Sequence, residues 1–202
     1  MKSKPWARIT FLLAVLQVLL ILVSWIVSSA APQTPLRSML SSEGIRWFMG
    51  RFAENLSSPY LAWLLLLSIA YGVLHTSGLY NTITAWTHGQ SIPYRKRFAL
   101  FLSFMLLLFF ILVVLYLTCV QHAVLLSATG HLFPSSFGSA LVPIVAFVIT
   151  TMSVTYGLLS GQYSSWQHAF EGMVFGLQYT LPLVVVYVFL AQFIFSLIYV
   201  FA

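Results

Sequence analysis

The chain has 202 residues, of which 60% are hydrophobic and only 6% are charged, with a formal net charge of +6. Soluble domains carry about 25% charged residues, so the composition excludes an ordinary soluble domain and predicts an all-α, polytopic integral membrane protein. The single cysteine excludes an intrachain disulfide. The basic residues flank apolar runs and form no aromatic-interleaved stripe, so we expect no nucleic-acid partner.

Five apolar runs are long enough to cross a bilayer as helices. We expect one transmembrane domain with spans at residues 9–31, 59–82, 98–120, 138–160 and 176–201. The first run could instead be a signal peptide, because Ser28, Ser29 and Ala30 resemble a cleavage site. The apolar core of a signal peptide has about 7–15 residues, and this longer run favours an uncleaved span.

Residues 43–56 precede the second span and have the periodicity of an amphipathic helix. One face carries the apolar residues Ile45, Phe48, Met49, Phe52 and Leu56. Ser41 or Ser42 can cap this helix, and Glu43 stands in the first turn, where the helix dipole favours an anion. We expect an interfacial helix on the membrane surface. A second, short amphipathic element is expected at 161–173, before the last span.

Two motifs in this part of the chain carry a family resemblance. They are the stretch SSEGIRW at 41–47, and Gly72 followed by Ser77, Gly78 and Leu79. Residues 36–79 as a whole resemble a segment of the p-aminobenzoyl-glutamate transporter (AbgT) family, which usually has a glutamate where this chain has His75. The run at 182–201 is similar to a late helix of that family that carries Ala-Gln-Phe.

Members of the AbgT family are longer and form the substrate site with re-entrant hairpins, for which this sequence shows no counterpart. The resemblance therefore implies a short, divergent, transporter-related protein of the bacterial inner membrane. It also implies a small organic anion, such as p-aminobenzoyl-glutamate, as the ligand. Because five spans without hairpins leave no enclosed site, we expect a homo-oligomer or a membrane partner protein. The alternative is a non-transporting assembly or interaction subunit of a larger complex.

His75 is the only candidate for a substrate-binding or proton-linked residue, because no span contains a charged side chain. The structural alternative, which we favour, is a polar helix end that is hydrogen-bonded to backbone or water. His122 and His131 lack a third ligand, so we expect no metal site. No nucleophile–base pair or nucleotide motif is visible in the sequence. We therefore expect that the protein is not an enzyme and that it binds no cofactor.

Small residues spaced four apart predict close helix packing in a bilayer. They form two sets, one in the second span and one in the fourth: Ser68 and Gly72, then Ser153, Gly157 and Gly161. The second set is also the face that would hold a partner in the assembly alternative. Gln17 and Gln192 are polar groups inside the first and last spans.

Lysine and arginine counts near the spans predict the orientation. Six of these residues precede the first span or lie between the second and third, and three lie between the first and second. This bias predicts a cytoplasmic N-terminus, and five spans then place the C-terminus outside. Contact with anionic lipid is the other expected role of these side chains.

Overall fold

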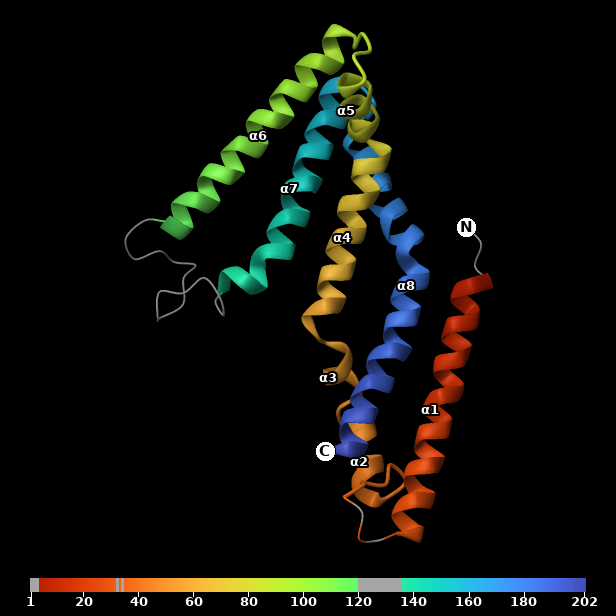
Figure 1. The fold of residues 1–202 in the computed structure, drawn as a ribbon. Coiled ribbons are helices and arrows are strands. Elements are labelled where there is room, and N and C mark those ends of the chain that lie inside the picture. Colours follow the sequence, from red (N-terminus) through yellow and green to blue (C-terminus); the bar gives the residue numbers. More distant parts are fainter. Residues whose placement is uncertain (1–3, 32, 34, 120–135) are drawn as a thin grey trace. The chain divides into compact units, whose positions relative to one another are not determined.

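A computed structural model describes residues 4–31, 33, 35–119 and 136–202. All regular structure in these ranges is helical (Figure 1). The helices are α1 (Lys4–Ala30), α2 (Ser42–Gly50), α3 (Phe52–Leu56), α4 (Pro59–Thr76), α5 (Leu79–Thr87), α6 (Tyr94–Cys119), α7 (Ser136–Ser160) and α8 (Trp166–Phe201). Five of them, α1, α4, α6, α7 and α8, are long and apolar enough to cross a membrane. The predicted all-α, five-span membrane fold is confirmed.

The described helices form two compact units. Unit 1 comprises Met1–Ala62 and Thr180–Ala202, and unit 2 comprises Trp63–Tyr179. Each unit therefore contains a part of α4 and a part of α8. The sites described below each lie within a single unit.

Unit 1 packs the loop after α1 and the helix α2 against the C-terminal turns of α8. The Arg37 N–H donates to the Val200 carbonyl at 3.1 Å, and the Met39 N–H donates to Ser24 Oγ at 3.2 Å. The rings of Trp47 and Tyr199 stack with centroids 4.4 Å apart. An apolar cluster surrounds these contacts, built from Met39, Tyr199 and Val200 together with Leu20, Ile21, Leu36, Trp47 and Phe48.

The predicted interfacial helix is present but is broken in two. Ser41 caps α2 by accepting a hydrogen bond from the Gly44 N–H at 3.0 Å, as its sequence position predicts. The single helix expected over 43–56 is wrong, because Arg51 leaves helical geometry with φ −99° and ψ 5°. Gly50, a poor helix former, precedes this break. The Met49 side chain is 73% exposed, so part of the predicted apolar face is left for lipid.

Unit 2 contains α5, α6 and α7 with the adjoining parts of α4 and α8. The second span was expected to continue to residue 82, but α4 ends at Thr76. Gly78 has a positive φ of 74°, which glycine adopts without strain, and Ser77 Oγ accepts the Leu79 N–H at 3.3 Å. These features end α4 and start the separate helix α5. Two apolar clusters hold unit 2 together; one centres on Tyr156 and the other on Tyr163.

The predicted division between a short element at 161–173 and a span from 176 is also wrong. One helix, α8, runs from Trp166 through Pro182 to Phe201. Gly172 and Gly176 do not interrupt this helix, since neither has a positive φ. Both residues pack closely against α4. The third span begins at Tyr94, a few residues earlier than expected, because the basic residues before 98 join its first turn.

Candidate functional site

A cavity of about 820 Å³ lies in unit 1. It is bounded by the loop after α1, by α2 and α3, and by the end of α8. We call it the arginine pocket. Its lining residues are Arg37, Glu43, Arg46, Trp47, Arg51, Glu54, Asn55, Phe195, Ile198, Tyr199 and Ala202. This volume falls within the range of about 300–1,000 Å³ that is usual for small-molecule sites.

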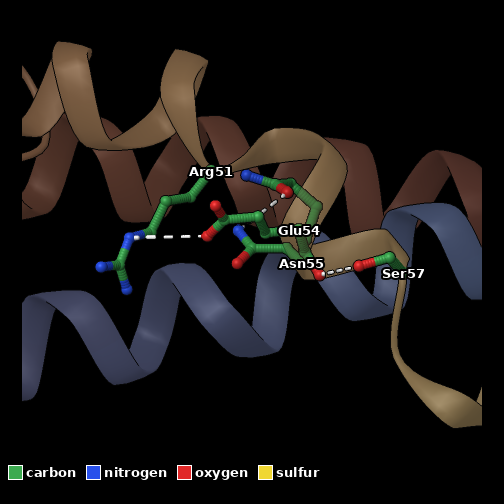
Figure 2. A network of polar contacts seen from close by, with 5 residues as sticks. Arg51, Glu54, Asn55 and Ser57 are labelled. Carbon is green, nitrogen blue, oxygen red and sulfur yellow. Dashed lines mark hydrogen bonds and ion pairs between the residues drawn. The ribbon is translucent and has the colours of Figure 1, made fainter.

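The charges in the arginine pocket are three arginines and two glutamates, an excess of one positive side chain. Arg51 Nε lies 3.8 Å from Glu54 Oε2 (Figure 2), and both side chains are exposed. An exposed pair of this kind stabilises a fold by no more than about 1 kcal/mol, so Arg51 can exchange this partner for a ligand. Arg37 and Arg46 make no ion pair with any residue that the structure describes.

The aromatic wall of the pocket is the stacked pair of Trp47 and Tyr199. The Arg37 guanidinium lies 5.9 Å from the centroid of the Tyr199 ring, which is within the range of a cation–π contact. The pocket thus combines unpaired guanidinium groups with an aromatic surface. Guanidinium groups bind carboxylates in a bidentate manner, and ring stacking favours ligands that contain an aromatic ring.

Asn55 joins the arginine pocket to the interior of unit 1. It is only 5% exposed, and its Nδ2 donates to Gln192 Oε1 at 3.4 Å. In the same unit, Gln17 Nε2 donates to Ser196 Oγ at 2.9 Å. Gln192 Nε2 and Gln17 Oε1 are buried and have no partner within the described part of the chain. Figure 2 shows Asn55 beside Arg51 and Glu54 on the same short segment.

The residues of the arginine pocket were not predicted as a ligand site from the sequence. Arg37, Arg46 and Arg51 were interpreted as determinants of topology and as contacts to anionic lipid, and Arg46 and Trp47 also as part of the motif at 41–47. A usable signal was present, because these arginines surround Trp47 within a short segment. Tyr199, by contrast, lies far away in the sequence, and only packing brings it to Trp47.

His75, the predicted site residue, does not lie in the arginine pocket but in unit 2. It occupies the last turn of α4 and is exposed. Its ring lies 5.7 Å from that of Phe175 and 6.0 Å from that of Tyr71, measured between centroids. It also lines a polar cavity of about 320 Å³ at the start of α5. Its substrate-binding or proton-linked role stays a prediction.

Tyr163 supports this region of unit 2 from the turn between α7 and α8. Its hydroxyl lies 2.7 Å from Thr76 Oγ1. Burial raises the pKa of Tyr163 above the usual value of a tyrosine, and the hydrogen bond with Thr76 offsets part of that rise. The phenol is therefore neutral at physiological pH, and it serves as a structural hydrogen-bonding group.

The predicted packing residues all lie in unit 2. A Cβ at Gly72 would meet the backbone of Gly172 and Gly176, so α4 and α8 are in direct contact there. Ser68 takes part in the same contact, because a Cβ at Gly176 would meet its carbonyl.

In α7, Ser153 is fully buried, and Gly157 lies against the ring of Tyr163. Gly161, however, lies beyond the end of α7 with φ 80°, beside the Arg95 guanidinium. The predicted helix face therefore stops at Gly157. Ser153 and Gly157 pack within this chain, and the contact with a partner that the assembly alternative placed on this face stays a prediction.

The described residues contain no group of three or more metal-ligating side chains. His122 and His131 lie outside the described ranges. No protein-family model, curated protein or solved structure matches this chain. The class that the fold defines is a multi-pass helical membrane protein, and the resemblance to the AbgT family stays a prediction.

Proposed function

We propose that this chain is a subunit of the bacterial inner membrane that binds a small organic anion and takes part in its transport. The observation that carries the proposal is the arginine pocket, where unpaired arginines face a stacked aromatic pair. An aromatic carboxylate such as p-aminobenzoyl-glutamate satisfies both features. This is also the ligand class that the resemblance of residues 36–79 implies.

The electrostatics of the pocket favour an anion over a neutral ligand. Charge-assisted hydrogen bonds from arginine to a carboxylate are about twice as strong as neutral ones. Arg46 makes no ion pair among the described residues, so an incoming anion does not have to displace a carboxylate from it. The expected partner is a second copy of the chain or another membrane protein that completes the path across the bilayer.

The assembly alternative is favoured by a different feature of unit 2. A groove between α6 and α7 is lined entirely by apolar side chains, among them Leu107, Phe110 and Met152. Such a groove can accept an apolar helix of another membrane protein. Under this alternative the chain would hold a complex together and would carry no flux.

The test is ligand binding to the purified full chain in mild detergent, measured by calorimetry with p-aminobenzoyl-glutamate and with benzoate. We expect Arg46→Gln to weaken binding by roughly tenfold or more, because it removes one charge-assisted contact. The matched control is Arg8→Gln, which removes the same charge from α1 outside the pocket. Equal weakening by both variants, or no binding by the wild-type chain, contradicts the proposal.

Flux in liposomes separates the transport proposal from the assembly alternative. We expect the isolated chain to bind the anion, and flux to require an oligomer or a co-purified partner. A monomer that transports by itself contradicts the need for a partner. If neither the oligomer nor any co-purified complex shows flux, although the anion binds, the result supports the assembly alternative.

A further inference from the structure

A second polar cavity, of about 320 Å³, lies in unit 2 between the end of α4, the helix α5 and the start of α6. We call it the lysine cavity. Its lining residues are His75, Thr76, Ser77, Gly78, Asn81, Thr82, Ala85, Ser91, Ile92, Pro93, Lys96, Tyr156 and Gln162. Polar groups dominate this lining, and it contains no acidic side chain. Lys96 is the only lining residue whose charge is permanent at neutral pH.

The floor of the lysine cavity is buried and its hydrogen bonds are satisfied. Thr82 Oγ1 and the Tyr156 hydroxyl lie 2.6 Å apart, and Thr82 Oγ1 also donates to the Gly78 carbonyl at 3.1 Å. Ser77 Oγ donates to the Leu74 carbonyl at 3.2 Å. The floor is thus a neutral surface whose hydroxyl groups are already hydrogen-bonded within the protein. It shapes the cavity but carries no charge that would repel or attract a charged ligand.

The rim of the cavity has free hydrogen-bond donors. Lys96, Asn81 and Gln162 make no side-chain hydrogen bond or ion pair with the described residues. Their ammonium and amide groups offer several N–H donors. Gln162 reaches the rim beside Gly78, close to where a Cβ at that glycine would lie. Residues from α5, from α6 and from the turn after α7 therefore present donors to one small space.

The charge of Lys96 is not compensated locally. No glutamate lines the lysine cavity, and Glu171, the glutamate of unit 2, lies 3.9 Å from His168. A cavity with an uncompensated ammonium, free amide donors and no carboxylate attracts anions and disfavours cations. Its volume suits a small ligand or the polar end of a larger one.

We propose that the lysine cavity binds the oxyanion group of a ligand, a phosphate or a carboxylate. Lys96 is the counter-ion, and Asn81 and Gln162 donate hydrogen bonds to the anionic oxygens. This site is separate in residues and in unit from the arginine pocket, so it does not rest on the proposed function. The oxyanion can belong to a free small anion or to a lipid headgroup, and the experiment distinguishes these sources.

The experiment titrates the purified full chain, in a neutral detergent, with inorganic phosphate, with acetate and with soluble dihexanoyl phosphatidylglycerol. We expect Lys96→Gln to weaken binding of the preferred probe by about tenfold or more, and Lys96→Arg to retain most of the affinity. The matched control is Arg97→Gln, which removes the same charge one residue away and outside the cavity. We expect a change of less than about twofold, because Arg97 does not line the cavity and so would not contact a ligand bound there. Asn81→Leu and Gln162→Leu should each weaken binding severalfold.

The pattern across probes and variants decides the outcome. Lys96-dependent binding of phosphate or acetate supports a site for a free anion, whereas Lys96-dependent binding of the lipid alone assigns the oxyanion to a headgroup. Equal losses in Lys96→Gln and Arg97→Gln would show general attraction to the basic segment and would overturn the proposal. Absence of binding of all three probes at millimolar concentration also overturns it. We expect the Lys96→Gln variant to bind p-aminobenzoyl-glutamate as the wild-type chain does. A failure of the lysine-cavity proposal can therefore be distinguished from a failure of the arginine-pocket proposal.

Discussion

The two compact units pack helices of similar composition by different means. In unit 1, amide side chains cross between segments, as in the contacts of Gln17 with Ser196 and of Asn55 with Gln192. Two of these amides keep a buried atom without a partner in the described chain. Unit 2 instead brings backbones together at glycines of α4 and α8. Some of its buried hydroxyls are paired, such as Thr82 with Tyr156, whereas Ser153 Oγ has no partner among the described residues.

The difference shows that two parts of a chain with few charges can be stabilised by different kinds of contact. Lipid supplies no hydrophobic drive for helix association, so close backbone packing and polar contacts must supply the stability. Unit 2 uses close packing, and the lysine cavity within it is smaller than the arginine pocket. Unit 1 packs with larger, polar side chains and leaves the larger pocket. We infer that replacing a glycine at the contact between α4 and α8 in unit 2 costs more stability than replacing a single buried amide in unit 1.

The largest expected effect comes from Gly72→Ala. The added Cβ would meet the backbone of Gly172 and Gly176, which cannot move aside as a flexible side chain can. We expect a loss of about 3 kcal/mol in the free energy of unfolding, measured by denaturation with sodium dodecyl sulfate in mixed micelles.

Gly50→Ala is the matched control for this substitution. A Cβ at Gly50 has no neighbouring atom within 4 Å, and alanine favours the helical conformation by about 1 kcal/mol over glycine. We therefore expect no loss of stability from the control. A Gly72→Ala chain as stable as the control would show that glycine packing does not hold unit 2 together.

A smaller effect is expected from Gln17→Leu in unit 1. The substitution removes the 2.9 Å hydrogen bond to Ser196, but it also removes the unpartnered Oε1. Hydrogen bonds between membrane helices contribute about 0.6 kcal/mol on average, so the net loss should stay below about 1 kcal/mol in the same assay. Ser28→Ala, which affects an exposed hydroxyl on the same helix, is the control. A loss larger than that of Gly72→Ala would reverse the comparison between the units.

The sequence predicted the elements of this fold better than their ends. Long apolar runs determine where spans occur, and the cap of α2 was narrowed to Ser41 or Ser42 because capping depends on local chemistry; the structure shows that it is Ser41. The break at Arg51, the end of α4 before Gly78 and the continuity of α8 were missed. The continuity of α8 depends on tertiary contacts that a local pattern does not contain, such as the packing of Gly172 against α4. The other two occur at local features, Gly50 for the break and Ser77 with Gly78 for the end of α4, which the hydrophobic pattern alone does not reveal.

The candidate sites were harder to predict from the sequence, because their residues come together only through tertiary contacts. His75 was selected because it is the only histidine within the predicted spans, which contain no charged residue, and it does line the lysine cavity. Lys96 was interpreted as a determinant of topology and as a contact to anionic lipid, not as part of a cavity. Asn81 and Gln162 were not singled out, because the turn after α7 must fold back onto the start of α5 before they share a cavity.

The most direct test of the membrane-spanning account is the labelling of single cysteines with a membrane-impermeant maleimide, in a chain that carries Cys119→Ser. Suitable positions are Lys4→Cys before the bulk of α1, Gly50→Cys at the end of α2 and Gln90→Cys after α5. The account predicts that Gly50→Cys reacts from outside the membrane, and that the other two react only after permeabilisation. Reaction of all three from one side, or loss of the Lys4→Cys segment from the mature chain by cleavage, would contradict it.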